Sequence, residues 1–375
     1  MKNVYDVVIA GGGIVGCACA YELTSLGMQV AVVECDVIGS GATAAGMGHI
    51  VIMDDSPAQF ALTQYSQQLW KDLVPQLPAN VEYESSGTIW VAADETEMME
   101  AASKQARYAE HGTHTVLLDA AALAEAEPYL RPGLAGGLLV PGDGVVYPPT
   151  AALWLAEKAC TQGATLYAGR RVVQAARGEV SLDDGTHLSA KHIVIATGAL
   201  APQLIPELPI RPRKGHLVIT DRYPGMVRHQ LVELGYLRSA SSNTGDSVAF
   251  NVQPRKTGQL LIGSSRQYEA ASAAVEPALL QRMLANASSY VPALADLSVL
   301  RVWTGFRAAT PDKLPMIGPW SADPSILFAT GHEGLGITTS LATGKLIADG
   351  LAKRASAIAR EPYLPARFAR EEQHA

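Results

Sequence analysis

Three glycines and one acidic residue near the start of the chain have the types and spacing needed to bind a dinucleotide. Gly11, Gly13 and Gly16 fit the pattern Gly-x-Gly-x-x-Gly, and Glu34 follows at the end of the next apolar run. The glycines permit a tight turn, a close approach of the backbone to a pyrophosphate and close packing of a helix on a strand. The carboxylate of Glu34 can accept hydrogen bonds from both hydroxyls of an adenosine ribose. These residues predict an adenine dinucleotide site.

The elements around these residues must hold them in place. Residues 5–10 and 30–33 are nearly continuous apolar runs, as expected of strands buried on both faces, and a helical stretch, residues 17–26, separates them. The start of that helix offers free N–H groups and a positive dipole end to phosphates. A glycine pattern alone is weak evidence, and its plainest interpretation is a turn without a ligand. The strand–turn–helix–strand context with an acid at its end makes the dinucleotide interpretation specific.

Three later segments are candidates for the same ligand. Residues 39–49 are rich in small side chains, which fits either a linker or a loop that passes close to a flat cofactor ring. The apolar run 191–195 ends in Ala-Thr-Gly, and a glycine-rich turn at 334–336 opens a helix over residues 337–353. The expected cofactor-binding residues are Gly11, Gly13, Ile14, Val15, Gly16, Glu34, Gly41, Ala42, Thr43, Gly46, Met47, Gly48, Val173, Ala196, Thr197, Gly198, Gly334, Leu335, Gly336 and Ile337.

Composition narrows the class of protein. The chain has 375 residues and a formal net charge of -7, which argues against a nucleic acid bound by a basic surface. It contains no run of about 18 uncharged apolar residues, so we expect no transmembrane helix. The first strand begins almost at the first residue, which predicts no signal peptide and a cytoplasmic location; the alternative is attachment to the inner membrane through a partner. The cysteines Cys17, Cys19, Cys35 and Cys160 include no C-x-x-C pair, so we expect all four to pack as small hydrophobes, with no metal site.

The fold class indicated is α/β, with a discontinuous Rossmann-like nucleotide-binding domain and an inserted substrate domain built on a mostly antiparallel sheet. The expected segments of the first domain are 1–80, 147–205 and 303–365, and those of the second are 81–146 and 206–302. Pro148 and Pro149 are expected to stop any helix, with a new one over residues 150–160. Residues 366–375 are expected to form a polar tail.

At this point the sequence resembles a known family, the FAD-dependent D-amino-acid oxidases, in particular their glycine oxidase-like branch. The resemblance covers nearly the whole chain. Within the branch it is strongest to the group of the D-hydroxyproline dehydrogenase β subunit, opine oxidase and hydrogen cyanide synthase flavoprotein subunits. Besides the segments above, it rests on Pro212-x-Lys214-Gly215-His216, Gly258-x-x-Leu261-Ile262-Gly263-Ser264, Trp303-x-Gly305-Phe306-Arg307, Pro311-Asp312-x-x-Pro315-x-Ile317-Gly318 and Gly331-His332.

The resemblance implies a flavoprotein that oxidises an amino or imino acid, such as a D-amino acid or a D-hydroxyproline-like compound, to the imine. Hydride would pass from the α-carbon of the substrate to flavin N5, at the boundary of the two domains. Arg307 stands where the family holds the substrate carboxylate, and a planar guanidinium suits that task. Relatives often place a tyrosine where this chain has Asn251, and His49 is either a polar anchor or base, or a structural histidine. FAD should be non-covalent, because no cysteine follows Cys160 at the position where the sarcosine oxidase branch attaches its flavin.

Other functions fit parts of the pattern. An NAD-dependent dehydrogenase would share the glycines and Glu34, although the glycine-rich start of the last helix favours FAD. A glycine- or sarcosine-type oxidase that uses oxygen is the nearest alternative within the family. An electron-relay subunit of a larger complex, with hetero-oligomeric partners or a separate electron acceptor, is a third possibility, and a flavin domain acting on modified tRNA is disfavoured by the acidic charge.

Overall fold

The computed structural model describes residues 4–235, 245–268, 270 and 272–368. The chain divides into two compact units. Unit 1 comprises Met1–Val81, Tyr147–Pro212 and Arg307–Ala375, and unit 2 comprises Glu82–Val146 and Arg213–Phe306. The segment 206–212, which we assigned to the inserted domain, falls in unit 1. The α/β fold class, with a Rossmann-like domain and an inserted domain, is confirmed.

Unit 1 is built on a sheet whose strands follow the order β17-β18-β11-β1-β2-β8. Neighbouring strands in the stretch from β18 to β8 are parallel, and β17 pairs with β18 in the antiparallel direction. A meander of β9 and β10 joins β11. The strands are β1 (Val4–Ala10), β2 (Val30–Glu34), β8 (Thr165–Ala168), β9 (Val172–Ala176), β10 (Glu179–Leu182), β11 (His187–Ile195), β17 (Met316–Pro319) and β18 (Ile326–Thr330).

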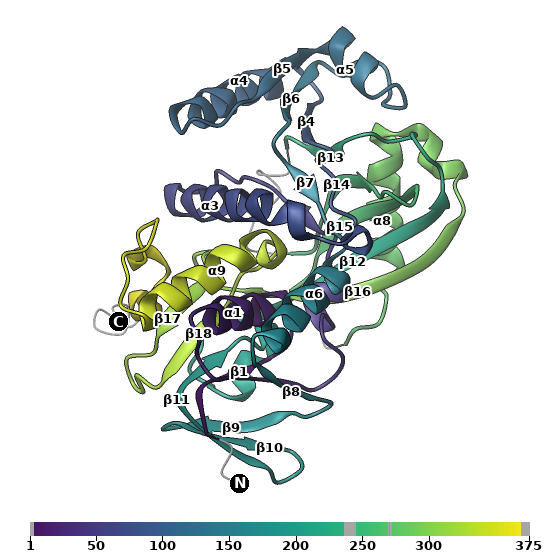
Figure 1. Ribbon diagram of the computed structural model, residues 1–375. Coiled ribbons are helices and arrows are strands. Elements are labelled where there is room, and N and C mark those ends of the chain that lie inside the picture. The colour runs from purple at the N-terminus through teal and green to yellow at the C-terminus, as the bar shows by residue number, and fades with distance from the viewer. Residues whose placement is uncertain (1–3, 236–244, 269, 271, 369–375) are drawn as a thin grey trace. The chain divides into compact units, whose positions relative to one another are not determined.

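Helices cover one face of this sheet. In Figure 1, α1 lies beside both α6 and α9, and α3 lies beside α9. The helices of unit 1 are α1 (Ile14–Ser25), α2 (Gly41–Ala44), α3 (Pro57–Leu73), α6 (Pro148–Thr161) and α9 (Gly336–Leu351). Because β1 is central, its side chains are buried on both faces: Val7 and Ile9 pack in one core, while Val8 and Ala10 pack in another with β9 and β10. This double burial accounts for the unbroken apolar run in the sequence.

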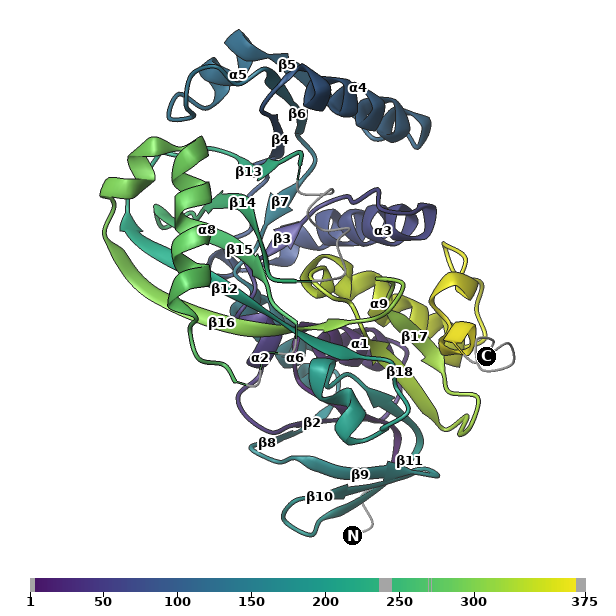
Figure 2. The ribbon, with the colours of Figure 1, turned by 180° about the vertical axis from the view of Figure 1, so that it is seen from behind.

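Unit 2 is built on a second sheet with the order β16-β12-β15-β14-β13-β4-β6-β5. From β12 to β5, neighbouring strands are antiparallel except for β13 and β4, which are parallel. In Figure 2, α8 crosses β14 and β15, whose apolar side chains form the core of the unit. The elements are β4 (Thr88–Ala92), α4 (Glu95–Glu110), β5 (Val116–Asp119), α5 (Ala120–Ala126), β6 (Gly136–Val140), β7 (Gly144–Val145), β12 (Arg211–Arg222), β13 (Gln230–Glu233), β14 (Ser247–Pro254), β15 (Gln259–Arg266), α8 (Pro277–Tyr290) and β16 (Val299–Ala309).

Three local expectations were wrong. Pro148 and Pro149 do not stop a helix; they form the first turn of α6, where a proline has no intrahelical N–H to lose. Two of the cysteines, Cys35 and Cys160, are exposed and not packed in a core. Residues 303–306, which we placed in the returning α/β domain, fall in unit 2, within β16 at the edge of the second sheet.

Asp94 caps α4 by accepting a hydrogen bond from the N–H of Glu97, and residues 183–186 form the turn between β10 and β11. Among the described residues, no helix combines the length and the hydrophobicity needed to cross a bilayer.

Candidate functional site

Glu34, at the end of β2, lies directly against the glycine-rich turn. Its Oε2 accepts a hydrogen bond from the N–H of Gly12 at 2.6 Å, and its Oε1 accepts one from the N–H of Asp36 at 2.8 Å. The side chain of this residue is buried, at 6 % exposure. The two backbone donors fix the carboxylate beside the turn that joins β1 to α1. Burial, and then the charge of Glu34, raises the pKa of the neighbouring Cys35 thiol.

The turn itself needs glycine for steric reasons. Gly11 has a φ of +107°, and a Cβ placed there would lie 2.5 Å from the carbonyl oxygen of Ala196. A Cβ on Gly16 would overlap the carbonyl oxygen of Gly11. Gly13 caps α1 without a side-chain cap of its own, and the N–H of Ile14 donates to the hydroxyl of Thr43 at 3.0 Å. The first turn of α1 therefore has no side-chain cap from its own N-terminal residue, as expected of a helix start that binds a pyrophosphate.

The small-residue loop after β2 is ordered. Gly41, Ala42 and Thr43 lie in the short helix α2, and Gly46, Met47 and Gly48 lead from it to β3 (His49–Ile50). The Thr43 hydroxyl ties this loop to the start of α1. These residues are thus held beside the first helix and do not form a free linker.

Ala196, Thr197 and Gly198 follow the carboxyl end of β11, next to β1 in the sheet. The hydroxyl of Thr197 is buried, and the structure gives it no hydrogen-bond partner among the described residues. An orphaned buried hydroxyl at the edge where the glycine turn lies is what a missing ligand would leave. Val173 lies in β9, at 52 % exposure.

The start of α9 meets the same region of unit 1. A Cβ on Gly46 would overlap the side chain of Ile337, and a Cβ on Gly336 would lie 3.9 Å from Val15. The hydroxyl of Thr338 donates to the carbonyl oxygen of His49 at 2.7 Å. The predicted cofactor segments from the beginning and the end of the chain therefore come together around the first turns of α1 and α9. Both helices begin without a side-chain cap.

Arg307 lies next to the loop that opens α9. Its Nε would be 3.7 Å from a Cβ added to Gly334, and the adjacent Ala308 accepts a backbone hydrogen bond from Glu333 at 2.9 Å. A Cβ at this position would be in ordinary van der Waals contact with the Arg307 side chain, so Arg307 packs directly against the loop. Arg307 is half-buried and has further polar interactions.

His332 is a buried neighbour of this loop. Its Nε2 forms a hydrogen bond of 2.9 Å with the hydroxyl of Thr343 in α9, and burial lowers its pKa to about 3. A neutral imidazole fixed to α9 fits a structural role.

Asn251 lies in β14 of unit 2, paired with Val232 of β13 and Gly263 of β15. Its side chain is 7 % exposed, and its Oδ1 has no hydrogen-bond partner in the described part of the chain.

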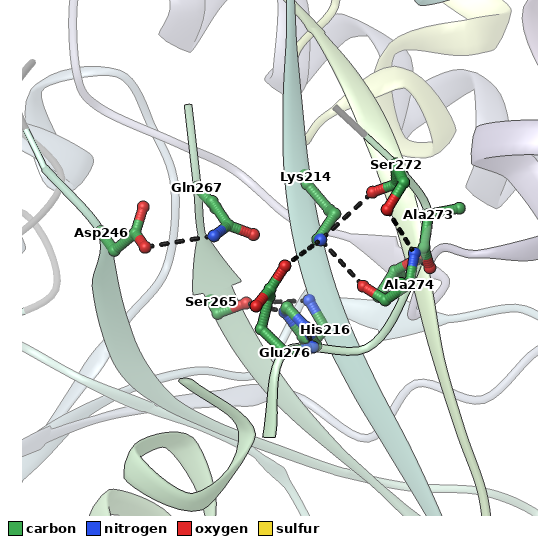
Figure 3. A network of polar contacts seen from close by, with 10 residues as sticks. Lys214, His216, Asp246, Ser265, Gln267, Ser272, Ala273, Ala274 and Glu276 are labelled. Carbon is green, nitrogen blue, oxygen red and sulfur yellow. Dashed lines mark hydrogen bonds and ion pairs between the residues drawn. The ribbon is translucent and has the colours of Figure 1, made fainter. Parts of the chain in front are cut away.

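Lys214 and His216, from the Lys214-Gly215-His216 motif, form a polar cluster in unit 2 (Figure 3). The buried ammonium of Lys214 donates to the carbonyl oxygens of Ser272 and Ala274, at 3.2 and 2.8 Å, and contacts Glu276 at 3.4 Å. His216 Nε2 accepts a hydrogen bond from the N–H of Glu276 at 2.9 Å. These contacts hold the segment after β15 against β12, so we assign this motif a structural role.

Sequence reasoning missed Thr338, which holds His49, and the polar neighbours of Asn251 on the second sheet. Thr338 lies on the buried side of α9, so its hydroxyl gave no polar signal. The neighbours of Asn251 could have been found from the alternation Thr88-Ile89-Trp90-Val91, which puts two polar side chains on the face opposite the apolar ones.

The sequence of this chain matches one family model and is similar to several known proteins over nearly its whole length. A model of the family described as DAO, FAD dependent oxidoreductase, matches residues 6–350. Glycine oxidase of Geobacillus kaustophilus is 28% identical over 378 residues, which cover 97% of each chain. Hydrogen cyanide synthase subunit HcnC of Pseudomonas aeruginosa is 26% identical over 419 residues, covering 98% of this chain and 97% of the relative.

The fold of this chain is also similar to that of solved structures over nearly its whole length. The crystal structure of glycine oxidase from Geobacillus kaustophilus superimposes with a TM-score of 0.86 at 28% identity, covering 97% of this chain and 98% of the other. L-proline dehydrogenase from P. horikoshii has the same fold, with a TM-score of 0.88 at 24% identity and 99% coverage of each chain.

Proposed function

The chain belongs to the DAO family of FAD-dependent oxidoreductases, and we propose that it oxidises an amino or imino acid to the corresponding imine. The two relatives that support this most directly are glycine oxidase and, at the level of the fold, L-proline dehydrogenase. The proposal depends on two parts of unit 1: the turn that would hold the adenosine and pyrophosphate of FAD, and Arg307 beside the start of α9.

The residues of unit 1 fit FAD. Glu34 would bind the adenosine ribose, the turn from Gly11 to Gly16 would approach the pyrophosphate, and the Thr197 hydroxyl would gain a partner. The first turn of α9 would direct N–H groups toward the ring, where they stabilise negative charge. FAD, when bound, takes up the hydride released from the substrate α-carbon. No residue after Cys160 offers a thiol for covalent attachment, so we propose that FAD is bound non-covalently.

The single observation that best supports an amino acid substrate is the position of Arg307. A carboxylate removed from water needs a charged partner of fixed geometry, and a guanidinium supplies two parallel hydrogen bonds. The side chain of Arg307 lies against Gly334, at the entrance to the helix that we assign to the cofactor. We propose that Arg307 binds the substrate carboxylate, and that His49, tied to α9 through its carbonyl, is a polar anchor.

Replacing Arg307 by alanine tests this assignment. Truncating one member of a buried charged pair costs about 2–5 kcal/mol, so kcat/KM for amino acids should fall by roughly 30-fold to several-thousand-fold. The bound flavin should stay at the wild-type level, since Arg307 lies outside the Glu34 turn. The measurement is steady-state turnover with a dye as acceptor, together with the flavin-to-protein absorbance ratio.

Two controls make the result specific. Arg307→Lys retains the charge without the planar fork and should recover only part of the activity. Amines that lack a carboxylate should lose far less than amino acids in Arg307→Ala. An equal loss for both substrate types, or an empty flavin site, would show that Arg307 is structural.

The finer identity of the substrate and acceptor is also a proposal. We favour a D-amino acid or a D-hydroxyproline-like imino acid as substrate. We expect the electrons to pass to an acceptor other than oxygen, such as a partner subunit, which an artificial dye replaces in the assay. The similarity to a hydrogen cyanide synthase subunit supports a partner, whereas the similarity to glycine oxidase supports direct reaction with oxygen. Turnover of a substrate panel, with peroxide release compared with dye reduction, separates the two: comparable rates would identify an oxidase.

A further inference from the structure

Two side chains of α3 in unit 1 form hydrogen bonds with the backbone of α9, which lies beside α3 (Figure 1). The indole N–H of Trp70 donates to the carbonyl oxygen of Thr338 at 3.2 Å. The hydroxyl oxygen of Ser66 accepts a hydrogen bond from the N–H of Ala342 at 3.1 Å. Ser66 and Trp70 are four residues apart in α3, so they lie on the same face of that helix. One face of α3 therefore holds α9 at two of its backbone groups.

These two backbone groups belong to the same step of the α9 hydrogen-bond ladder. In a regular α-helix the carbonyl oxygen of one residue accepts from the N–H of the residue four positions later, and this rule pairs Thr338 with Ala342. The side chains of α3 offer each of the two groups a second partner. A side chain that enters a helix ladder is one of the known causes of a local change in helix direction. The direction of the first turn of α9, residues 336–339, thus depends on α3 as well as on the bonds within α9.

A third contact holds the first turn of α9 from another element. The hydroxyl of Thr338 donates to the carbonyl oxygen of His49 in β3, at 2.7 Å. Thr338 is therefore bound through its carbonyl oxygen by α3 and through its hydroxyl by β3. The neighbouring Ile337 packs against Gly46, in the loop that leads to β3. The first turn of α9 is clamped between two elements of unit 1.

The contacts of this clamp are sealed from water. The side chains of Ser66 and Trp70 are 0% exposed, and that of Thr338 is 1% exposed. Water cannot replace a partner that is removed at such a site, and a buried backbone group needs a partner. If Ser66 or Trp70 loses its polar atom, the backbone of α9 has to adjust until its own bonds are satisfied.

The first turn of α9 is the part of the helix that we assign to the flavin ring. It begins without a side-chain cap, so the N–H groups of its first residues are available to a ligand. A helix start stabilises negative charge, and the effect falls off within the first turn. A reduced flavin carries more negative charge than an oxidised one. A small change in the direction of this turn should therefore change the relative stability of the two states.

We propose that Ser66 and Trp70 are positioning residues for the cofactor, which hold the first turn of α9 in the direction that favours reduced flavin. They act through Thr338 and Ala342 and need no contact with the flavin itself. This inference rests on the proposed function, since it names the residues that set how readily the bound flavin accepts hydride.

The test measures the reduction of the bound flavin without any amino acid. The flavin-loaded protein is reduced slowly by xanthine and xanthine oxidase together with a reference dye, and the ratio of reduced to oxidised flavin is read when the dye is half reduced. Ser66→Val and Ser66→Thr have the same shape, but only threonine keeps an acceptor for the N–H of Ala342. Ser66→Val should lower the ratio about two- to tenfold, the effect of one altered hydrogen bond. Ser66→Thr should stay within about twofold of the wild type.

A second variant and a control accompany this pair. Trp70→Phe removes the donor to Thr338 and should lower the ratio in the same direction. Tyr363→Phe removes the hydroxyl that donates to the carbonyl oxygen of Ala58, in the first turn of α3, at 2.7 Å. This control weakens the attachment of α3 to another element, so it should lower the melting temperature and leave the ratio unchanged. If Trp70→Phe fails to fold, the two Ser66 variants decide.

The outcomes separate this inference from the proposed function. A ratio that is unchanged or raised in Ser66→Val would overturn the inference, as would an equal fall in Ser66→Thr or in Tyr363→Phe. Because the reductant is not a substrate, the ratio is measured whether or not the protein oxidises amino or imino acids. Failure to turn over any amino or imino acid would instead refute the proposed function.

Discussion

For Arg307, the sequence predicts a role in binding, and only the fold shows which residues lie beside it. From the sequence, the segment Gly305-Phe306-Arg307 indicated a carboxylate anchor through resemblance alone. The structure adds its neighbour, Gly334, and the backbone bond between Ala308 and Glu333 that brings the two segments together. A bridge between residues 25 positions apart in the chain depends on long-range pairing, which no local pattern encodes.

His332 makes a prediction about acid stability. Its pKa is about 3 in the folded chain and about 6.5 when unfolded. The unfolded state therefore binds the proton more readily between these values. The contribution of His332 to stability is complete above about pH 6.5, and it declines as the pH falls toward 3, by up to about 1.4 kcal/mol per pH unit.

The variant His332→Gln tests this sign. It removes the titrating group and keeps a polar partner for the hydroxyl of Thr343. The loss of unfolding free energy between pH 7.5 and pH 5 should be about 2 kcal/mol smaller than in the wild type. His114→Gln, at an exposed position, is the matched control for replacing a histidine by glutamine. An unchanged pH profile in His332→Gln would show that the buried imidazole does not control acid stability.

At the scale of elements, the contact of α1 with α9 joins the two ends of the predicted cofactor site. Gly344 permits this contact, because a Cβ there would lie 2.6 Å from the carbonyl oxygen of Ala18. Backbone atoms of a packed helix cannot move aside independently, so the two helices would have to separate.

We therefore expect Gly344→Ala to lower the free energy of unfolding by about 1–3 kcal/mol through overpacking. Gly350→Ala, in the same helix, is the control: a Cβ there meets only the end of the Arg360 side chain, which can move. The control should be neutral, or stabilising by up to about 1 kcal/mol from helix propensity. Chemical denaturation of the two variants measures the difference; equal effects would mean that the helices tolerate a wider spacing.

The elements differ in how far the sequence predicted them. The unit β1–α1–β2 and the contact of Glu34 with its turn follow from local patterns: a strand buried on both faces, glycines at positions where a Cβ would clash, and an acid at the strand end. The polar neighbours of Asn251 were missed because they come together only when β4, β13 and β14 are paired in register. The first turn of α6 was missed because prolines were taken only as helix breakers, although they are accepted at the first helical positions.

At the scale of the molecule, three features fit the same cofactor, FAD. They are the family, the turn beside Glu34 and the converging starts of α1 and α9. Membership of the FAD-dependent family decides between FAD and NAD, which the glycine pattern left open. The formal net charge of -7 likewise disfavours a nucleic-acid substrate.

Anaerobic mixing of the purified, flavin-loaded protein with amino and imino acids tests the central claim most directly. The flavin absorbance should be lost upon addition of a substrate and recovered when a dye is added, with one imine, or the carbonyl compound formed from it by hydrolysis, per flavin reduced. Acid precipitation should then release all of the flavin. A protein that purifies without flavin and instead reduces NAD with the same substrates, or a bound flavin that no amino or imino acid reduces, would contradict the account.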